Sequence, residues 1–153
     1  MKVFISHSTK DIKIVERFVD KLKTIGIEPY VAESDIQPGT ILWEKLESNI
    51  KNSDCVLAII TKDGSRSKSV QQEIAAANAL KIRVVPFVEK GVDLKGVLAG
   101  REYIAFDKND PDLALINASK YLSKLKVKKE SKKTIVIMVI AGLLISLLSQ
   151  SGK

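Results

Sequence analysis

The stretch that decides the fold is DCVLAIIT, residues 54–61. Every residue between Asp54 and Thr61 is apolar, without the alternation of apolar and polar residues that a strand with one solvated face shows. A short apolar run bounded by polar loops is typical of a parallel-sheet strand that is covered on both faces. Cys55 lies within the run, and we interpret it as a small buried hydrophobic residue.

Expected strands and helices alternate on both sides of this run. The expected strands occupy residues 2–6, 28–32, 54–61, 83–88 and 102–106. Helical spacing or helix-start signals mark residues 12–25, 41–51, 67–78, a short stretch within 91–100, and a helix from Asp110 to about Leu125. The alternation predicts an α/β protein, with an open parallel five-stranded sheet in three layers. Strands 2–6, 54–61 and 83–88 are the most apolar, so we expect them at its centre.

One carboxylate lies at the edge where such a sheet binds ligands, the carboxyl ends of its strands. The loops expected there are SHSTKD (6–11), AESDIQPGT (32–40), TKDGSRSKS (61–69) and VEKGVDLK (88–95). Glu73 follows the third loop, about one turn into a helix. An acid at that position also stabilises a helix dipole without any chemical role. From spacing alone, both interpretations of Glu73 remain open.

Composition excludes several kinds of site. The chain has 153 residues with one cysteine and one histidine, which excludes an internal disulfide and argues against a zinc site built by this chain alone. The formal net charge is +7, but lysines are concentrated in KYLSKLKVKKESKK (120–133), where Glu130 is the one acid. Because the charge is not spread over a face of the domain, we do not expect nucleic-acid binding, and anionic lipid is the simpler partner.

An apolar segment, TIVIMVIAGLLISLL (134–148), follows the lysines. A full membrane span needs about 20 residues, with a lower limit of about 17. We expect a transmembrane helix over residues 134–149 after a basic juxtamembrane linker over 126–133. This single-pass C-terminal anchor would place the domain in the cytoplasm. A core helix or a hydrophobic oligomerisation tail is the alternative interpretation.

Three motifs in order give the sequence a family resemblance: KVFISHSTKD (2–11), SDIQPGTILWEKLESNIKNSDCVLAIIT (34–61) and SKSVQQEI (67–74). Together they resemble a TIR (Toll/interleukin-1 receptor) domain of the prokaryotic type, over residues 1–125. The resemblance implies a flavodoxin-like fold, which agrees with the predicted order of elements. It also implies one of two functions. Some TIR domains are adaptors that self-associate. Others cleave NAD+ at the nicotinamide–ribose bond and give ADP-ribose or a cyclic isomer, often in anti-phage defence.

The resemblance implies roles for individual residues. A glutamate early in this helix is catalytic in the enzymatic class, and here that position is Glu73. The expected substrate-binding residues come from the first strand end, the loop 32–40 that also mediates head-to-tail assembly, and the two following helices: Ser6, His7, Ser8, Lys10, Asp35, Pro38, Gly39, Trp43 and Ser69. NAD+ would be the substrate, and neither a cofactor nor a metal is expected.

Some of these positions have competing interpretations. Ser69 stands where family members often carry an aromatic residue, and it looks like a helix N-cap, a role that Ser67 could also take. Trp43 and Glu47 share one helix face, so an aromatic packed against its helix is the preferred interpretation there. His7 is ranked below Glu73. Arg66 and Lys68 could meet a pyrophosphate, although solvated surface charge is the simpler interpretation.

The sequence therefore predicts a membrane-anchored TIR NAD+ glycohydrolase or cyclase that self-associates and whose ADP-ribose product is sensed by a downstream effector. The alternative is a non-catalytic TIR adaptor that acts by self-association at a membrane. The presence of Glu73 favours the enzyme, and the absence of an aromatic residue at Ser69 favours the adaptor.

Overall fold

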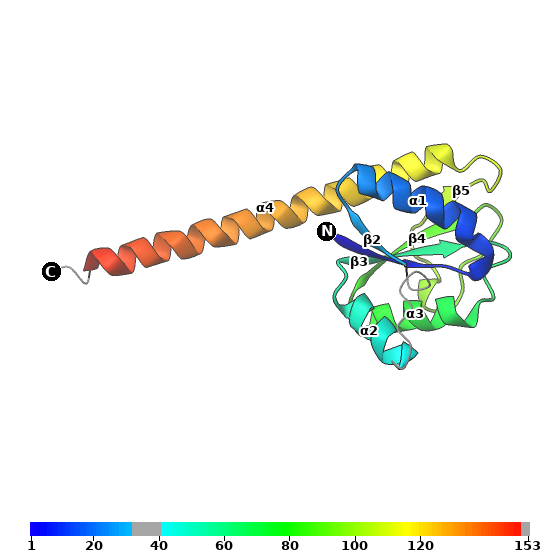
Figure 1. Cartoon of the computed structure of the whole chain (residues 1–153), viewed down its shortest axis with the longest axis horizontal. Helices are drawn as coiled ribbons and strands as arrows, with labels where there is room; N and C mark the ends of the chain where they lie inside the picture. Colours follow the sequence, from blue (N-terminus) through cyan, green and yellow to red (C-terminus); the bar gives the residue numbers. More distant parts are fainter. Residues whose placement is uncertain (32–40, 151–153) are drawn as a thin grey trace. The chain divides into compact units, whose positions relative to one another are not determined.

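The computed structural model describes residues 1–31 and 41–150, with side chains described as far as Ile140. Its five strands are β1 (Lys2–Ser6), β2 (Glu28–Tyr30), β3 (Cys55–Ile60), β4 (Arg83–Glu89) and β5 (Ile104–Phe106). They form one parallel sheet in the order β2-β1-β3-β4-β5 (Figure 1). The predicted parallel sheet, with the three most apolar strands at its centre, is confirmed.

β3 is the middle strand of this sheet, and all six of its residues are buried. Its Leu57 lies between Ile5 of β1 and Val85 of β4. Cys55 begins the strand and is 0% exposed. Burial is the main cause that raises the pKa of the Cys55 thiol from 9.0 to about 12. Cys55 is therefore an inert hydrophobic residue in the folded chain, as its position in the sequence indicated.

Helices cover both faces of the sheet. They are α1 (Ile12–Thr24), α2 (Leu42–Lys51), α3 (Lys68–Ala79) and α4 (Asp112–Gln150), with short 3-10 helices η1 (Thr9–Asp11) and η3 (Gly96–Leu98). α1 and the first turns of α4 lie on one face, and α2 and α3 lie on the other (Figure 1). α1 ends before Gly26, whose φ of +67° is the left-handed conformation expected of a C-terminal glycine.

Two apolar layers hold these helices on the sheet. On one face, the ring of Phe87 in β4 stacks on that of Phe106 in β5, with ring centroids 4.3 Å apart. The ring of Phe18 in α1 meets the Phe87 ring edge-on, with centroids 4.6 Å apart. On the other face, Phe4 of β1 belongs to a buried cluster that includes Ile74 of α3. This second layer fixes α3 against β1 and β3.

The C-terminal part of the chain differs from the prediction. The chain divides into two compact units, Met1–Lys120 and Tyr121–Lys153. α4 begins in the first unit and continues in the second, so residues 126–133 are helical rather than a linker between two elements.

The predicted transmembrane helix over residues 134–149 is not supported. In the part of the chain that the structure describes, no helix has a stretch both long and apolar enough to cross a membrane. The apolar segment over residues 134–148 is also shorter than the lower limit of about 17 residues for a span. The prediction of a single-pass anchor, and the membrane location derived from it, is therefore wrong.

Candidate active site

A buried pair of polar side chains joins α3 to the end of β1. Glu73 is 8% exposed, and Ser6, the last residue of β1, is 0% exposed. The Ser6 hydroxyl donates a hydrogen bond to Oε2 of Glu73 over 2.6 Å. Burial of a carboxylate is costly unless it is hydrogen-bonded, and this contact contributes part of the compensation.

The local sequence explains how Glu73 comes to this place. Ser67 caps the start of α3, with its hydroxyl accepting from the Val70 backbone N–H. Val70 and Ile74, one turn apart, are 2% and 4% exposed and fix the rotation of the helix on the sheet. Glu73 then points toward Ser6. Because Ser6 lies where the strand order reverses between β1 and β3, the pair is at the topological switch point of the sheet.

The loop after β1 continues this edge. His7 and Ser8 are 6% and 7% exposed. Nδ1 of His7 lies 2.9 Å from the Ser8 carbonyl oxygen, and because a carbonyl only accepts, Nδ1 is the donor and carries the proton. The Ser8 hydroxyl accepts from the Lys10 backbone N–H at 3.3 Å and so caps η1. The Lys10 residue is exposed.

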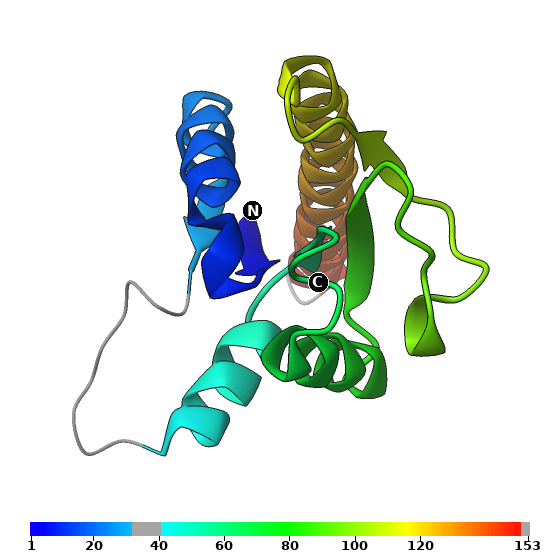
Figure 2. The ribbon, with the colours of Figure 1, turned by 90° about the vertical axis from the view of Figure 1, so that its right-hand side faces the viewer.

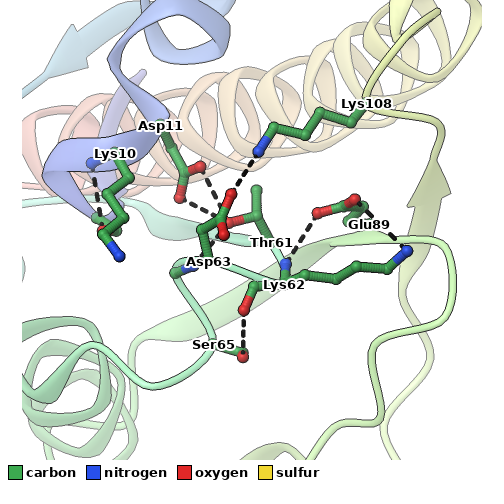
Figure 3. A network of polar contacts seen from close by, with 10 residues as sticks. Lys10, Asp11, Thr61, Lys62, Asp63, Ser65, Glu89 and Lys108 are labelled. Atoms are coloured by element: carbon green, nitrogen blue, oxygen red, sulfur yellow. Dashed lines mark hydrogen bonds and ion pairs between the residues drawn. The ribbon is translucent and has the colours of Figure 1, made fainter.

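Asp11 has a role that the sequence pattern did not indicate. Both of its carboxylate oxygens lie within 3.0 Å of the Thr61 hydroxyl, which donates to them and in turn accepts from the Gly64 N–H at 2.8 Å (Figure 3). A Cβ at Gly64 would come within 2.5 Å of Asp11 Oδ2, so a larger residue does not fit there without movement. This network ties the loop after β1 to the loop after β3.

Burial also sets the acidity of this carboxyl. Asp11 is 3% exposed, and desolvation raises its pKa above the ordinary value of 3.8. The hydrogen bond from Thr61 and the charges of Lys108 and His7 oppose that rise, and Asp63 adds to it. Lys108 binds the exposed Asp63 at 2.7 Å and lowers the pKa of that carboxyl (Figure 3).

The other expected site residues are less closely joined to Glu73. Ser69 lies one turn before Glu73 on α3 but is exposed, with its hydroxyl 2.9 Å from that of Ser67. Ser67, and not Ser69, is therefore the cap. Trp43 is 44% exposed at the start of α2, so the expected packed aromatic is not observed. The predicted site residues Asp35, Pro38 and Gly39 lie outside the described residues.

Buried carboxylates are the acidic groups that the described residues place at this edge. Within residues 1–31 and 41–150, no group of three His, Cys, Asp or Glu side chains is arranged to hold a metal ion. Glu73 is positioned by the Ser6 hydroxyl, and His7 and Ser8 follow Ser6 in sequence. Asp11 is held by Thr61 in the adjoining loop. A negative charge held at a strand edge can stabilise positive charge that develops on a bound molecule.

Solved structures with the same fold come from several kinds of protein. The TIR domain of the Toll-related receptor TRR-2 from Hydra magnipapillata aligns with a TM-score of 0.67 and 18% identity, over 80% of this chain and 97% of that chain. The CMP N-glycosidase BcmB of Clostridium botulinum aligns with a TM-score of 0.59 and 18% identity, over 79% and 99%. A TIR-STING receptor from C. gigas gives 0.62 and 21%, over 76% and 39%.

The family comparison is more specific than these structural likenesses. A comparison with curated proteins found no match. The family model described as TIR domain matches residues 3–118, which include the five strands except Lys2 of β1 and also include the Ser6–Glu73 pair. The chain therefore belongs to the TIR domain family.

Proposed function

We propose that this TIR domain cleaves the N-glycosidic bond of a nucleotide, with NAD+ as the substrate and Glu73 as the catalytic residue. The observation that carries the proposal is the buried Glu73 carboxylate, held by the Ser6 hydroxyl at 2.6 Å at the switch point of the sheet. A carboxylate that served only the helix dipole would remain in solvent, where its charge needs no partner.

The chemistry of the reaction suits a single carboxylate. The bond between ribose C1′ and the nicotinamide nitrogen breaks, and its electron pair stays on nicotinamide, which leaves as a neutral base. Positive charge then develops on the ribose, as in glycoside hydrolysis generally. The negative charge of Glu73 stabilises it. Water adds to C1′ and loses a proton, which gives ADP-ribose, whereas attack by the adenine ring gives a cyclic isomer.

The structure suggests a change in the role of Ser6. Its hydroxyl donates to Glu73, so we assign Ser6 a positioning role rather than direct substrate binding. His7, Ser8 and Lys10 remain the proposed substrate contacts of the β1 edge, together with Trp43 and Ser69 and with Asp35, Pro38 and Gly39 of the loop 32–40.

A Clostridium botulinum protein of similar fold is described as a CMP N-glycosidase. This supports N-glycosidic chemistry on this fold, but with cytosine rather than nicotinamide as the released base.

The direct test incubates the full-length chain with NAD+ and, separately, with CMP, and resolves the products by chromatography and mass spectrometry. We expect nicotinamide release that falls at least a hundredfold in Glu73→Gln. Glu47→Gln, which removes an exposed acid of α2, is the matched control and should retain activity. Release of cytosine alone would keep the reaction class and change the substrate. Folded protein that cleaves neither compound would contradict the proposal.

A second candidate function, adaptor activity through contact between copies, is favoured by a different observation. Ile41, Leu42 and Trp43 are consecutive in sequence and 63%, 67% and 44% exposed. Adjacent exposed apolar residues are typical of association surfaces. Self-association is compatible with catalysis. A role in anti-phage defence, with a downstream effector that senses the product, stays a prediction from the family resemblance.

A further inference from the structure

A cavity of about 990 Å³ lies on the side of α3 away from Ser6. It is open to solvent on one side and is bordered by the loop after β3, by one face of α3 and by the loop from Gly91 to η3. Figure 2 shows the chain that leads to η3 passing alongside α3. Its volume is at the upper end of the range of about 300–1,000 Å³ that small-molecule sites occupy.

The cavity does not include the Ser6–Glu73 pair, although it shares Lys10 with the proposed substrate contacts of the β1 edge. Neither Glu73 nor Ser6 lines it. Val70 and Ile74 face the cavity, whereas Glu73, the residue before Ile74, points toward Ser6 of β1. α3 therefore lies between the Ser6–Glu73 pair and this cavity, and a ligand in the cavity does not have to contact Glu73.

The floor and the rim of the cavity differ in character. The floor includes four buried apolar side chains, Ile60, Val70, Ile74 and Leu98, which are 6%, 2%, 4% and 4% exposed. The rim carries charged residues, namely the cations Lys10, Lys62, Arg66 and Lys95 and the acids Asp63 and Asp93. An apolar floor with a few charged groups at its edge is the usual composition of a site for a small organic ion.

The charges on the rim do not cancel. Asp63 is bound by Lys108, which does not line the cavity, at 2.7 Å, and Lys62 lies 3.9 Å from Glu89. Among the described residues, no ion pair engages Lys10, Arg66 or Lys95. The charge of Lys10 also acts on Asp63, so Asp93 is the acid of the lining that remains to set against Arg66 and Lys95. A cleft lined by one sign of charge raises the local concentration of ligands of the opposite sign.

We propose that this cavity is a second, non-catalytic binding site for an organic phosphate. The phosphate would be bound by the cations of the rim, with Arg66 and Lys95 on opposite sides of it, and a planar ring would lie on Val70, Ile74 and Leu98. A guanidinium group matches the oxygens of a phosphate with paired hydrogen bonds, and lysines add positive charge. The volume is much larger than inorganic phosphate requires, which is why the ligand class includes a ring.

The test uses adenosine 5′-monophosphate as the probe and backbone amide shifts of the full-length, isotope-labelled chain as the measurement. We expect shifts in residues 66–75 and 91–98, with weaker binding of adenosine alone and of inorganic phosphate alone. Arg66→Glu and Lys95→Glu should each weaken binding at least tenfold. Lys90→Glu, which reverses the charge of an exposed residue outside the lining, should change it less than twofold.

A second pair of variants tests the cavity itself, without changing any charge. Ala75 lines it and is exposed, so Ala75→Phe fills space that the ligand would occupy and should abolish binding. Ala79→Phe, one turn further along the same helix and outside the lining, should bind normally. If the shifts centre on Ser6, His7 and Glu73, or if no shift occurs, or if the lining variants bind as the wild type does, the cavity is not an organic-phosphate site.

Discussion

Ser6 and Glu73 are 67 positions apart in sequence, and one hydrogen bond joins them. We predict that Ser6→Ala lowers kcat for NAD+ cleavage roughly tenfold to a hundredfold with little change in KM, since the carboxylate loses its fixed orientation but the substrate contacts remain.

The matched control for Ser6→Ala is Ser53→Ala. Ser53 is also a buried serine, and its hydroxyl donates to the Asn49 carbonyl at 2.7 Å. It lies just before β3 begins, at the opposite edge of the sheet from the last residue of β1, Ser6. Each substitution should cost about 1 kcal/mol of unfolding free energy. Only Ser6→Ala should lower kcat, and equal activity of the two variants would contradict a positioning role for Ser6.

Asp11 makes the stability of the fold depend on pH. Because burial raises the pKa of Asp11 on folding, the folded chain binds this proton more tightly than the unfolded chain does. The contribution of Asp11 to the free energy of unfolding is therefore fully present below its ordinary pKa of 3.8, which applies to the unfolded chain. It falls as the pH rises through the higher pKa of the folded chain. Asp11→Asn keeps an oxygen that accepts from Thr61 but cannot ionise.

We therefore predict that the wild type loses stability relative to Asp11→Asn as the pH rises from about 4 to 7. Urea unfolding of both proteins at several pH values, followed by circular dichroism, measures the difference. Because the other titratable groups near Asp11, which include His7, Asp63 and Lys108, are present in both proteins, they largely cancel in the comparison. Parallel stability curves would contradict the prediction.

At the scale of elements, the start of α3 decides where Glu73 points. Ser67 caps the helix, whereas Ser69 is exposed within its first turn. We predict that Ser67→Ala lowers the free energy of unfolding by about 1 kcal/mol, and that Ser69→Ala changes it by a few tenths at most. Thermal or urea unfolding measures both. A larger loss in Ser69→Ala would restore Ser69 as the cap.

The sheet was predictable from sequence because burial on both faces leaves a simple pattern. The run 55–60 has no polar residue, and the three most apolar strands are the ones at the centre of the sheet. Glu73 was predicted as the site carboxylate from the family resemblance. Its buried contact with Ser6 was not predicted, because no local pattern pairs residues that distant in sequence.

Other features were missed for the same reason or were misinterpreted. The role of Asp11 was missed because its carboxylate accepts from Thr61, 50 positions away. Trp43 shared a helix face with Glu47, yet that face is exposed rather than packed. The apolar run after Lys133 was read as a membrane span, although its length is below the usual range. Long-range pairing and exposure are decided by packing, which a single sequence does not display.

At the scale of the whole molecule, the exposed apolar residues at the start of α2 matter for association between copies. Leu42 is 67% exposed, and Leu113, in the first turn of α4 on the other face of the sheet, is 70% exposed. We predict that Leu42→Ser weakens self-association roughly tenfold and that Leu113→Ser leaves it unchanged, because only the first lies in a run of exposed apolar residues. Sedimentation velocity over a range of concentrations measures both. Equal effects would indicate non-specific association.

The burial of Cys55 gives the molecule its own reporter of rare opening events. This thiol is the chain's one cysteine, and it begins a strand that is hydrogen-bonded to a neighbour on each side. A thiol reagent cannot reach it until the sheet separates, and its raised pKa keeps the unreactive protonated form in the folded state. The labelling rate under native conditions therefore measures how often the middle of the sheet opens. The same labelling rate can be measured in the wild type and in every variant above that retains Cys55, without adding a probe.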